Sequence, residues 1–261
     1  MGDIMLVQSY SHGASTKPLI GETLGVNFDA AVKKWGERDA LIVRHQNVRW
    51  SYLELQEKVN AFAAGLLNLG LEPGDRVGIW SPNNSEWVVV QYATAKAGLI
   101  LVNINPAYRV AELEYAINKV GCKALILTSS FKSSDYVAMV GELAPEISKS
   151  TPGNISCGRL PSLNTLIQIG GKTNDGYFDF GQIPGLASDK DFERLKVLSD
   201  ELQFDDPINI QFTSGTTGFP KGATLTHFNV LNNGYFTGEG LKFTSSDKLC
   251  VPVPLYHCFG M

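Results

Sequence analysis

The sequence is poor in cysteine, and the few cysteines it has are scattered. Only four occur among 261 residues, at positions 122, 157, 250 and 258, and no two of them form a C-x-x-C pair. This content is far below that of a disulfide-held scaffold, and the spacing does not suit a zinc ribbon. The pattern favours a protein whose thiols stay reduced.

Long apolar runs and an excess of positive charge are also lacking. The most apolar stretch, residues 87–102, is interrupted by Gln91 and Lys96, so no run approaches the roughly 20 residues of a membrane-spanning helix. Residues 1–25 show neither a secretory signal nor an Arg-rich amphipathic face, so no targeting signal is expected. The net charge of −4 argues against general nucleic-acid binding, although it allows a local basic site for one phosphate-bearing ligand.

Apolar residues are abundant and regularly spaced. They make up 44% of the chain, which predicts a globular protein of roughly one to two domains. Ser51 and Glu54 form an S-x-x-E capping box, and apolar residues recur behind it at positions 55, 59, 62, 66 and 69. This spacing predicts one face of a helix, which Gly70 ends.

Strand and helix patterns alternate along most of the chain. Strands are predicted at residues 40–43, 48–50, 76–81, 99–102, 124–128, 163–169, 208–212 and 249–253, and helices at 51–69, 84–96, 109–120, 133–143 and 191–202. Residues 149–161 and 170–190 are predicted to be loops. The alternation indicates an α/β protein that is Rossmann-like, with mostly parallel sheets and helices on both faces.

One loop carries most of the functional information. The apolar strand at residues 208–212 runs into Thr213-Ser214-Gly215-Thr216-Thr217-Gly218-Phe219-Pro220-Lys221-Gly222. Glycines allow successive N–H groups to point into one concavity, and the four hydroxyls add further donors. The Lys221 ammonium adds a full positive charge, and Pro220 stiffens the exit of the loop. These residue types together predict a site for a nucleotide triphosphate.

The loop differs from a Walker A sequence. That pattern requires Lys directly after the second glycine and Ser or Thr after the Lys. Here Gly218 and Lys221 are separated by two residues, and Gly222 follows the lysine. A plain Ser/Thr/Gly surface turn is the alternative, but the Pro-Lys-Gly tail directly after a buried strand favours the phosphate site.

Residues 213–221 resemble the phosphate-loop signature of the acyl-adenylate-forming superfamily, which includes acyl-CoA synthetases, peptide-synthetase adenylation domains and luciferases. Three other stretches agree in the same order: W-S-Y-L-E-L at 50–55, A-K-A-G followed by N-P-A-Y within 95–108, and P-L-Y-H-C-F-G at 254–260. Residues 103–108 and 206–212 are most similar to the medium-chain acyl-CoA ligase branch, with an amino-acid adenylation domain as a less similar alternative. The resemblance runs from about residue 21 to residue 261.

The resemblance implies a two-step, AMP-forming fatty acid–CoA ligase. A fatty acid carboxylate attacks the α-phosphorus of ATP, and the thiol of coenzyme A then displaces AMP. The implied small-molecule partners are a fatty acid, ATP with Mg²⁺, and coenzyme A. Residues 213–221 would hold the β- and γ-phosphates, with Lys221 stabilising the leaving pyrophosphate. The branch implies a mitochondrial location, with a cytoplasmic location as the alternative.

His257 is the second catalytic candidate from the resemblance. The family places this residue between the acyl site and the α-phosphate, and a carboxylate already ionised at pH 7 needs orientation rather than a base. A buried structural histidine at a strand end is the alternative. The adjacent Cys258 suggests a thiol nucleophile, but neighbouring residues on a strand would point to opposite faces.

The resemblance also predicts the domain organisation. Residues 1–20 would form an N-terminal extension and residues 21–261 part of an N-terminal AMP-binding domain, without the C-terminal domain. The family's adenine, ribose, Mg²⁺ and coenzyme A residues, and its C-terminal catalytic lysine, would lie beyond residue 261, so no metal ligand is assigned here. We therefore expect this chain to be inactive alone. The alternative is a non-catalytic nucleotide-phosphate-binding or interaction module.

Overall fold

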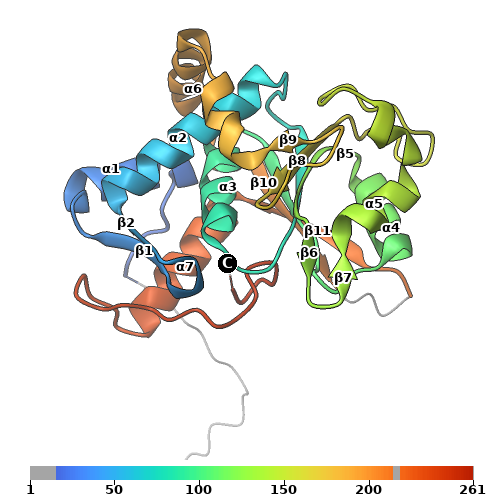
Figure 1. Cartoon of the computed structure of the whole chain (residues 1–261). Helices are drawn as coiled ribbons and strands as arrows, with labels where there is room; N and C mark the ends of the chain where they lie inside the picture. The colour runs from blue at the N-terminus through green and yellow to red at the C-terminus, as the bar shows by residue number, and fades with distance from the viewer. Residues whose placement is uncertain (1–15, 214–217, 261) are drawn as a thin grey trace, which may run out of the picture.

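The computed structural model describes residues 16–213 and 218–260, which form a seven-stranded sheet with helices on both faces (Figure 1). The strand order is β11-β10-β4-β3-β5-β8-β9, and every neighbouring pair is parallel except β10 and β11. The strands are β3 (Arg76–Trp80), β4 (Ile100–Asn103), β5 (Cys122–Thr128), β8 (Thr165–Ile169), β9 (Phe178–Asp179), β10 (Pro207–Thr213) and β11 (Lys221–Thr226). The predicted mostly parallel α/β architecture is confirmed.

Each face of the sheet has its own apolar core. One face packs against α1 (Leu24–Trp35), α2 (Tyr52–Asn68), α3 (Ser85–Lys96), η3 (Phe180–Leu186) and α6 (Asp189–Glu201). The other face packs against α4 (Val110–Val120), α5 (Tyr136–Leu143) and η2 (Pro145–Lys149). The last helix, α7 (His227–Gly240), lies beside α1, where Val230 and Leu231 pack on Leu24. Within the described parts of the chain, no helix has the length and apolar content needed to cross a bilayer.

Local sequence signals explain several of these boundaries. The Ser51 hydroxyl accepts from the Glu54 N–H, and the Glu54 carboxylate accepts from the Ser51 N–H, so the predicted capping box forms at the start of α2. Before it, β1 (Asp39–Val43) and β2 (Val48–Ser51) form the predicted hairpin around η1 (Arg44–Gln46). Asn47 closes that turn with φ of 54°, a left-handed conformation that asparagine tolerates.

Other predicted boundaries were wrong. Residues 249–253 form no strand, because Pro252 and Pro254 lack the N–H groups that a sheet ladder requires. The helix predicted from residue 133 begins only at Tyr136, after a small hairpin of β6 (Ser130–Phe131) and β7 (Ser134–Asp135). The predicted loop 170–190 contains β9 and η3, and the sequence patterns missed α1 and β11.

The topology creates a natural crevice at one edge of the sheet. The chain leaves β3 toward α3 on one face, whereas it leaves the neighbouring β4 toward α4 on the other face. The loops after these two strands therefore diverge at their carboxyl ends. This divergence is the topological switch point at which open α/β sheets bind ligands.

Candidate functional site

The predicted phosphate loop begins and ends on a strand pair at this same edge. Thr213 ends β10 and Lys221 begins β11, and the two residues are paired in register. The Thr213 hydroxyl donates to the Lys221 carbonyl over 3.4 Å. The predicted residues Ser214, Gly215, Thr216 and Thr217 lie outside the described residues. The Thr213 hydroxyl and the Lys221 ammonium group therefore both belong to the residue pair from which the loop extends.

The exit of the loop is held by α4. The Tyr115 hydroxyl donates to the Pro220 carbonyl over 3.0 Å, and the Tyr115 ring stacks on Phe219 with centroids 5.3 Å apart. Gly218 has φ of +102°, which other residues rarely adopt, and open space surrounds its α-carbon. The exit therefore has a fixed conformation with room for a ligand beside it.

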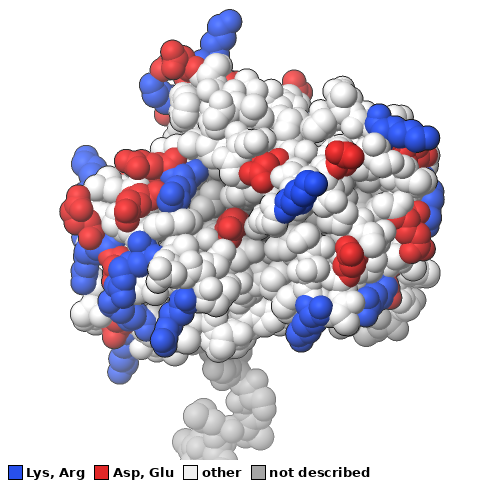
Figure 2. All heavy atoms as spheres, viewed as in Figure 1, with Lys and Arg blue, Asp and Glu red and all other residues white. Residues whose placement is uncertain are grey.

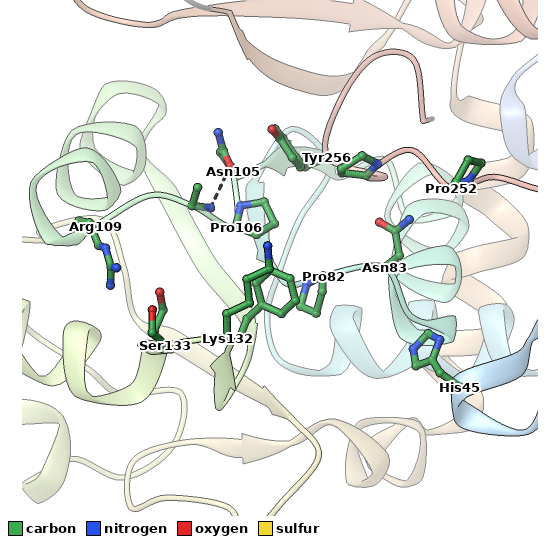
Figure 3. A pocket seen from close by; sticks show the side chains of 14 residues that line it. His45, Pro82, Asn83, Asn105, Pro106, Arg109, Lys132, Ser133, Pro252 and Tyr256 are labelled. Atoms are coloured by element: carbon green, nitrogen blue, oxygen red, sulfur yellow. Dashed lines mark hydrogen bonds between the residues drawn. The ribbon is translucent and has the colours of Figure 1, made fainter.

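A cavity of about 670 Å³ occupies the switch point of the sheet (Figure 3). The loop after β3 contributes Pro82 and Asn83, and the loop after β4 contributes residues 105–107 and Arg109. The remaining walls come from His45, residues 131–134 and the C-terminal segment through Pro252, Pro254 and Tyr256. The cavity thus joins five segments that are distant in the sequence.

The charges that line this cavity have one sign. Arg109 and Lys132 line it together with His45 and neutral polar and apolar side chains, and no Asp or Glu is among the described residues of the lining. In Figure 3 the Lys132 side chain extends toward Pro106, into the space between the loops. Cationic side chains form charge-assisted hydrogen bonds with phosphate oxygens, and proline and tyrosine faces suit a flat ring. The cavity therefore fits a phosphate-bearing ligand with an apolar part.

Two buried aromatic donors fix the loop after β4. Trp80 Nε1–H donates to the Asn105 carbonyl over 3.0 Å, and the Tyr136 hydroxyl donates to the Pro106 carbonyl over 2.6 Å. The two rings stack with centroids 3.7 Å apart, and both side chains are fully buried. Burial raises the pKa of Tyr136, so its hydroxyl remains a donor. No sequence motif marks these residues, because they meet only through the packing of α5 on the sheet.

Asn83 attaches the C-terminal segment to the switch point. Its amide group donates to the Val253 carbonyl over 2.9 Å, and its side-chain oxygen accepts from the Leu255 N–H over 2.7 Å. One carboxamide thus replaces the pair of bonds that a neighbouring strand would supply. No sequence motif marks this role, because Asn83 lies about 170 residues before the segment that it holds.

His257 lies in a turn of the segment that Asn83 holds. It is exposed, and its N–H donates to the Pro254 carbonyl over 3.0 Å, so the alternative of a buried strand end is wrong. Its Nδ1 accepts from the Phe259 N–H over 3.2 Å. In the neutral ring the proton is then on Nε2, which can donate to an anion. Tyr256 lines the cavity, whereas His257 does not.

The prediction that Cys258 and His257 point to opposite faces of a strand was wrong. The two residues do not lie on a strand, and the Cys258 sulfur is 3.8 Å from His257 Nδ1. Their side chains therefore lie on the same side of the turn. The Nδ1 lone pair already accepts the Phe259 N–H, which leaves it poorly placed to take a proton from the thiol.

A second cavity lies on the other side of the C-terminal segment. It has a volume of about 310 Å³ and is lined from that segment by Leu255 and Gly260. Helices α1, α3 and α7 supply the remaining walls, which are mostly apolar. Because Pro254 and Tyr256 line the first cavity, the segment with His257 separates a cationic cavity from an apolar one.

The chain is similar to known proteins of one family over most of its length. The family model described as "AMP-binding enzyme" matches residues 28–261. The mitochondrial medium-chain acyl-CoA ligase ACSF2 of Danio rerio is 45% identical over 257 residues, which cover 98% of this chain and 42% of that protein. The corresponding protein of Homo sapiens is 42% identical, again over 97% of this chain and 42% of its own length.

Solved structures share the fold. A long-chain-fatty-acid–CoA ligase (FadD1) from Archaeoglobus fulgidus superposes with a TM-score of 0.73 at 23% identity, over 95% of this chain and 46% of that one. At that identity the likeness concerns the fold alone. By length, the chain spans about 42% of the two curated relatives described above.

Proposed function

The chain belongs to the AMP-binding enzyme family, and on that premise we propose that it serves in the ATP-dependent activation of a medium-chain fatty acid to its coenzyme A thioester. The family match over residues 28–261 carries the proposal, because it includes the strand pair that brackets the phosphate loop. The identity of 45% to a medium-chain acyl-CoA ligase supports the choice of acid.

The proposed reaction has two steps. An oxygen of the fatty acid carboxylate attacks the α-phosphorus of ATP, and the bond to pyrophosphate breaks to leave an acyl-adenylate. The thiol of coenzyme A, after losing its proton, then attacks the acyl carbon and AMP leaves. No covalent bond to the protein forms, so the protein contributes positioning and charge neutralisation. Mg²⁺ enters with ATP as its counter-ion.

The loop residues take the pyrophosphate end of ATP in this proposal. Lys221 and the Thr213 hydroxyl sit at the neck of the loop, and the left-handed Gly218 leaves its backbone open to an anion. Ser214, Gly215, Thr216 and Thr217 would supply the remaining donors. An ammonium group next to the leaving phosphates stabilises the charge that develops on them.

The two cavities match the two other substrates. The first, which Arg109 and Lys132 line, suits the phosphate-bearing part of coenzyme A, so on this proposal not all coenzyme A residues lie beyond residue 261 as the resemblance implied. The second suits the acyl chain, because its walls are apolar. His257 lies on the segment between them, where its Nε2–H would orient the carboxylate.

We also propose that these 261 residues bind nucleotide without completing the reaction. The relatives that are named medium-chain acyl-CoA ligases are more than twice as long as the region that this chain matches. A nucleotide-phosphate-binding or interaction module is the second candidate. Incubation of the chain with ATP, Mg²⁺, coenzyme A and octanoate tests the proposed inactivity: no octanoyl-CoA should form, and its steady formation would show that the 261 residues suffice.

Binding of MgATP tests the loop directly. The substitution Lys221→Ala should weaken MgATP binding at least about tenfold, because it removes a charge-assisted contact to the phosphates. Lys190→Ala, on the exposed surface of α6, is the matched control and should leave affinity unchanged. Equal affinities for the wild type and Lys221→Ala, measured by calorimetry, would refute the assignment of the loop.

The names of the relatives bear on location. Both ACSF2 proteins are described as mitochondrial, which supports the same location for this protein, with the cytoplasm as the alternative. Expression of the full-length protein with a C-terminal fluorescent tag, followed by imaging against a mitochondrial marker, distinguishes the two compartments.

A further inference from the structure

Helix α7 supplies one wall of the second cavity, and the middle of that wall has no side chain. From α7 the cavity is lined by Val230, Leu231 and Gly234. At about 100° per residue, Gly234 lies between the other two around the helix axis, about 40° from Val230 and about 60° from Leu231. A side chain at position 234 would therefore extend from the same face of α7, toward the cavity.

Neither common structural reason for a glycine applies at Gly234. Its φ is not positive, so the backbone conformation does not require glycine. Among the described residues, a β-carbon added to it would meet no heavy atom within 4 Å, apart from its two neighbours in the chain and the adjacent backbone of α7. At Gly65 in α2, by contrast, that atom would lie 2.3 Å from the Ile183 carbonyl oxygen, so Gly65 permits close packing. Gly234 instead leaves space open.

A glycine at this place also lowers the stability of the helix. Gly234 lies in the middle of the 14-residue α7, where glycine is less favourable than alanine because it loses more conformational freedom on folding. Gly234 is exposed, so no tight core restricts the residue type. The one feature that the glycine provides is room beside the cavity.

We infer that Gly234 is a specificity-determining residue of the second cavity: the space beside it accommodates an apolar chain, and a side chain at this position would exclude long chains. The inference rests on the proposed function, which places the acyl chain of the acid in this cavity. None of the described lining residues is charged, so the group beside Gly234 must be uncharged. The volume of about 310 Å³ is at the small end of ligand pockets, so losing the space of a few carbon atoms should matter.

The size of the effect follows from counting carbon atoms. Gly234→Leu adds four carbon atoms, and an eight-carbon chain has four more methylene groups than a four-carbon chain. Burial of each methylene group raises affinity about fourfold. If the cavity buries all four, the longer chain binds on the order of a hundredfold more tightly. Gly234→Leu should remove most of this advantage, whereas Gly234→Ala, which adds one carbon atom, should reduce it about fourfold.

Two straight-chain alcohols, 1-octanol and 1-butanol, test the inference without involving the carboxylate site. Titration can be followed by tryptophan fluorescence, because Trp87 lines the cavity. The wild-type chain should bind 1-octanol on the order of a hundredfold more tightly than 1-butanol, and Gly234→Leu should bind the two within about tenfold of each other. Octanoate and butanoate, titrated in parallel, should show the same loss.

Gly141→Leu is the matched control. Gly141 lies in α5 on the opposite face of the sheet, a β-carbon there would also meet no heavy atom within 4 Å, and it is not among the described residues that line either cavity. This variant should retain the advantage of 1-octanol. An equal advantage in Gly234→Leu and the wild type would overturn the inference, as would a wild type that does not bind 1-octanol.

The melting temperature without ligand gives an independent check. Gly234→Leu should melt at a higher temperature than the wild type, because leucine favours the helix and its side chain covers apolar walls. A lower melting temperature would show that the added side chain finds no room, and would also overturn the inference.

This outcome is distinguishable from failure of the proposed function. The alcohols carry no carboxylate or phosphate, so their binding does not depend on Lys221 or on ATP. If Lys221→Ala left MgATP binding intact while Gly234→Leu removed the advantage of 1-octanol, the role of Gly234 would stand and the ligase proposal would fall. If Lys221→Ala weakened MgATP binding while Gly234→Leu kept that advantage, the ligase proposal would stand and the role of Gly234 would fall.

Discussion

The central strands and the C-terminal segment, residues 241–260, are built in contrasting ways. In β3, β4 and β5 nearly every apolar side chain is buried, and the two faces of the sheet have separate cores. In residues 241–260 large apolar side chains are exposed, up to 68% for Leu249 and 78% for Phe259. Figure 1 shows this segment running along the outside of the molecule as a chain without helices or strands.

Both regions contribute walls to the same cavity, so the contrast bears on function. The wall from the sheet is fixed by buried donors, Trp80 and Tyr136, and its geometry is set by the fold. The wall from residues 252–256 is attached mainly through the carboxamide of Asn83. Figure 2 shows charged side chains of both signs over the face of the molecule that is in view.

The largest expected effect tests the buried wall. Trp80→Ala should lower the free energy of unfolding by about 3–5 kcal/mol, because it leaves a cavity and removes the stack on Tyr136. It also leaves the Asn105 carbonyl without its donor. Urea unfolding followed by circular dichroism measures the loss.

Phe259→Ala is the matched control from the exposed region. It removes a ring that is 78% exposed, so the free energy of unfolding should change by no more than about 0.5 kcal/mol. Similar losses for Trp80→Ala and Phe259→Ala would mean that the contrast between the two regions is wrong.

Acid tests a buried contact outside both regions, between α7 and α1. His227 begins α7, its Nδ1 accepts from the Leu24 N–H of α1 over 3.0 Å, and its Nε2 is buried with no hydrogen-bond partner in the described parts of the chain. Burial lowers the pKa of His227 to about 4, against a weaker opposite effect of Asp206. Between about pH 6.5 and pH 4 the unfolded chain binds this proton and the folded chain does not. The free energy of unfolding should therefore decrease as the pH is lowered through this range, by about 3 kcal/mol in total for this residue.

His227→Gln provides the comparison for the acid experiment. The Gln side chain can still accept from Leu24, but it does not titrate in this range. The difference in unfolding free energy between wild type and variant, measured by urea titration at several pH values, should shrink as pH falls from 7 to 4. A constant difference would show that His227 is protonated equally in both states.

The fold followed from the sequence because it depends on periodic patterns. The S-x-x-E box at Ser51 marked the start of α2, as the structure confirms. The strand prediction at 249–253 was wrong because it relied on apolar spacing and ignored Pro252 within the range and Pro254 just after it. Strand β11 was missed because most of its residues are small or polar and lack the apolar pattern of a strand. Its strand conformation is evident only from its pairing with β10.

The next largest effect tests the attachment by Asn83. Asn83→Ala removes both bonds to residues 253 and 255, so the segment should be released about five- to thirtyfold more often, which corresponds to 1–2 kcal/mol. Limited proteolysis within residues 241–260 should accelerate accordingly, while the midpoint of global unfolding changes little. Asn83→Asp keeps the acceptor and should give an intermediate rate.

An unchanged rate of proteolysis in Asn83→Ala would show that other contacts hold the segment. One such contact is the exposed Lys248–Asp39 ion pair, with 3.0 Å between nitrogen and oxygen. Exposed ion pairs of this kind contribute little. Lys248→Ala should therefore accelerate proteolysis less than Asn83→Ala does.

The site was only partly visible in the sequence. The Thr213–Lys221 run was recognisable because glycines, hydroxyl side chains and a lysine are the residue types that bind phosphate, and here they are adjacent in the sequence. The cationic cavity was not, because Arg109, Lys132 and His45 come from three separate segments that meet only at the switch point.

The smallest expected effect concerns Cys258, which is exposed and 3.8 Å from His257 Nδ1. That nitrogen already accepts the Phe259 N–H, so it cannot readily activate the thiol. Cys250, also exposed in the same segment, is an internal control. Iodoacetamide should label the two thiols at rates within about threefold at pH 7, as expected for ordinary exposed cysteines. Much faster labelling of Cys258 that His257→Ala abolishes would instead establish a thiol–imidazole pair, and the turn would then be chemically active in its own right.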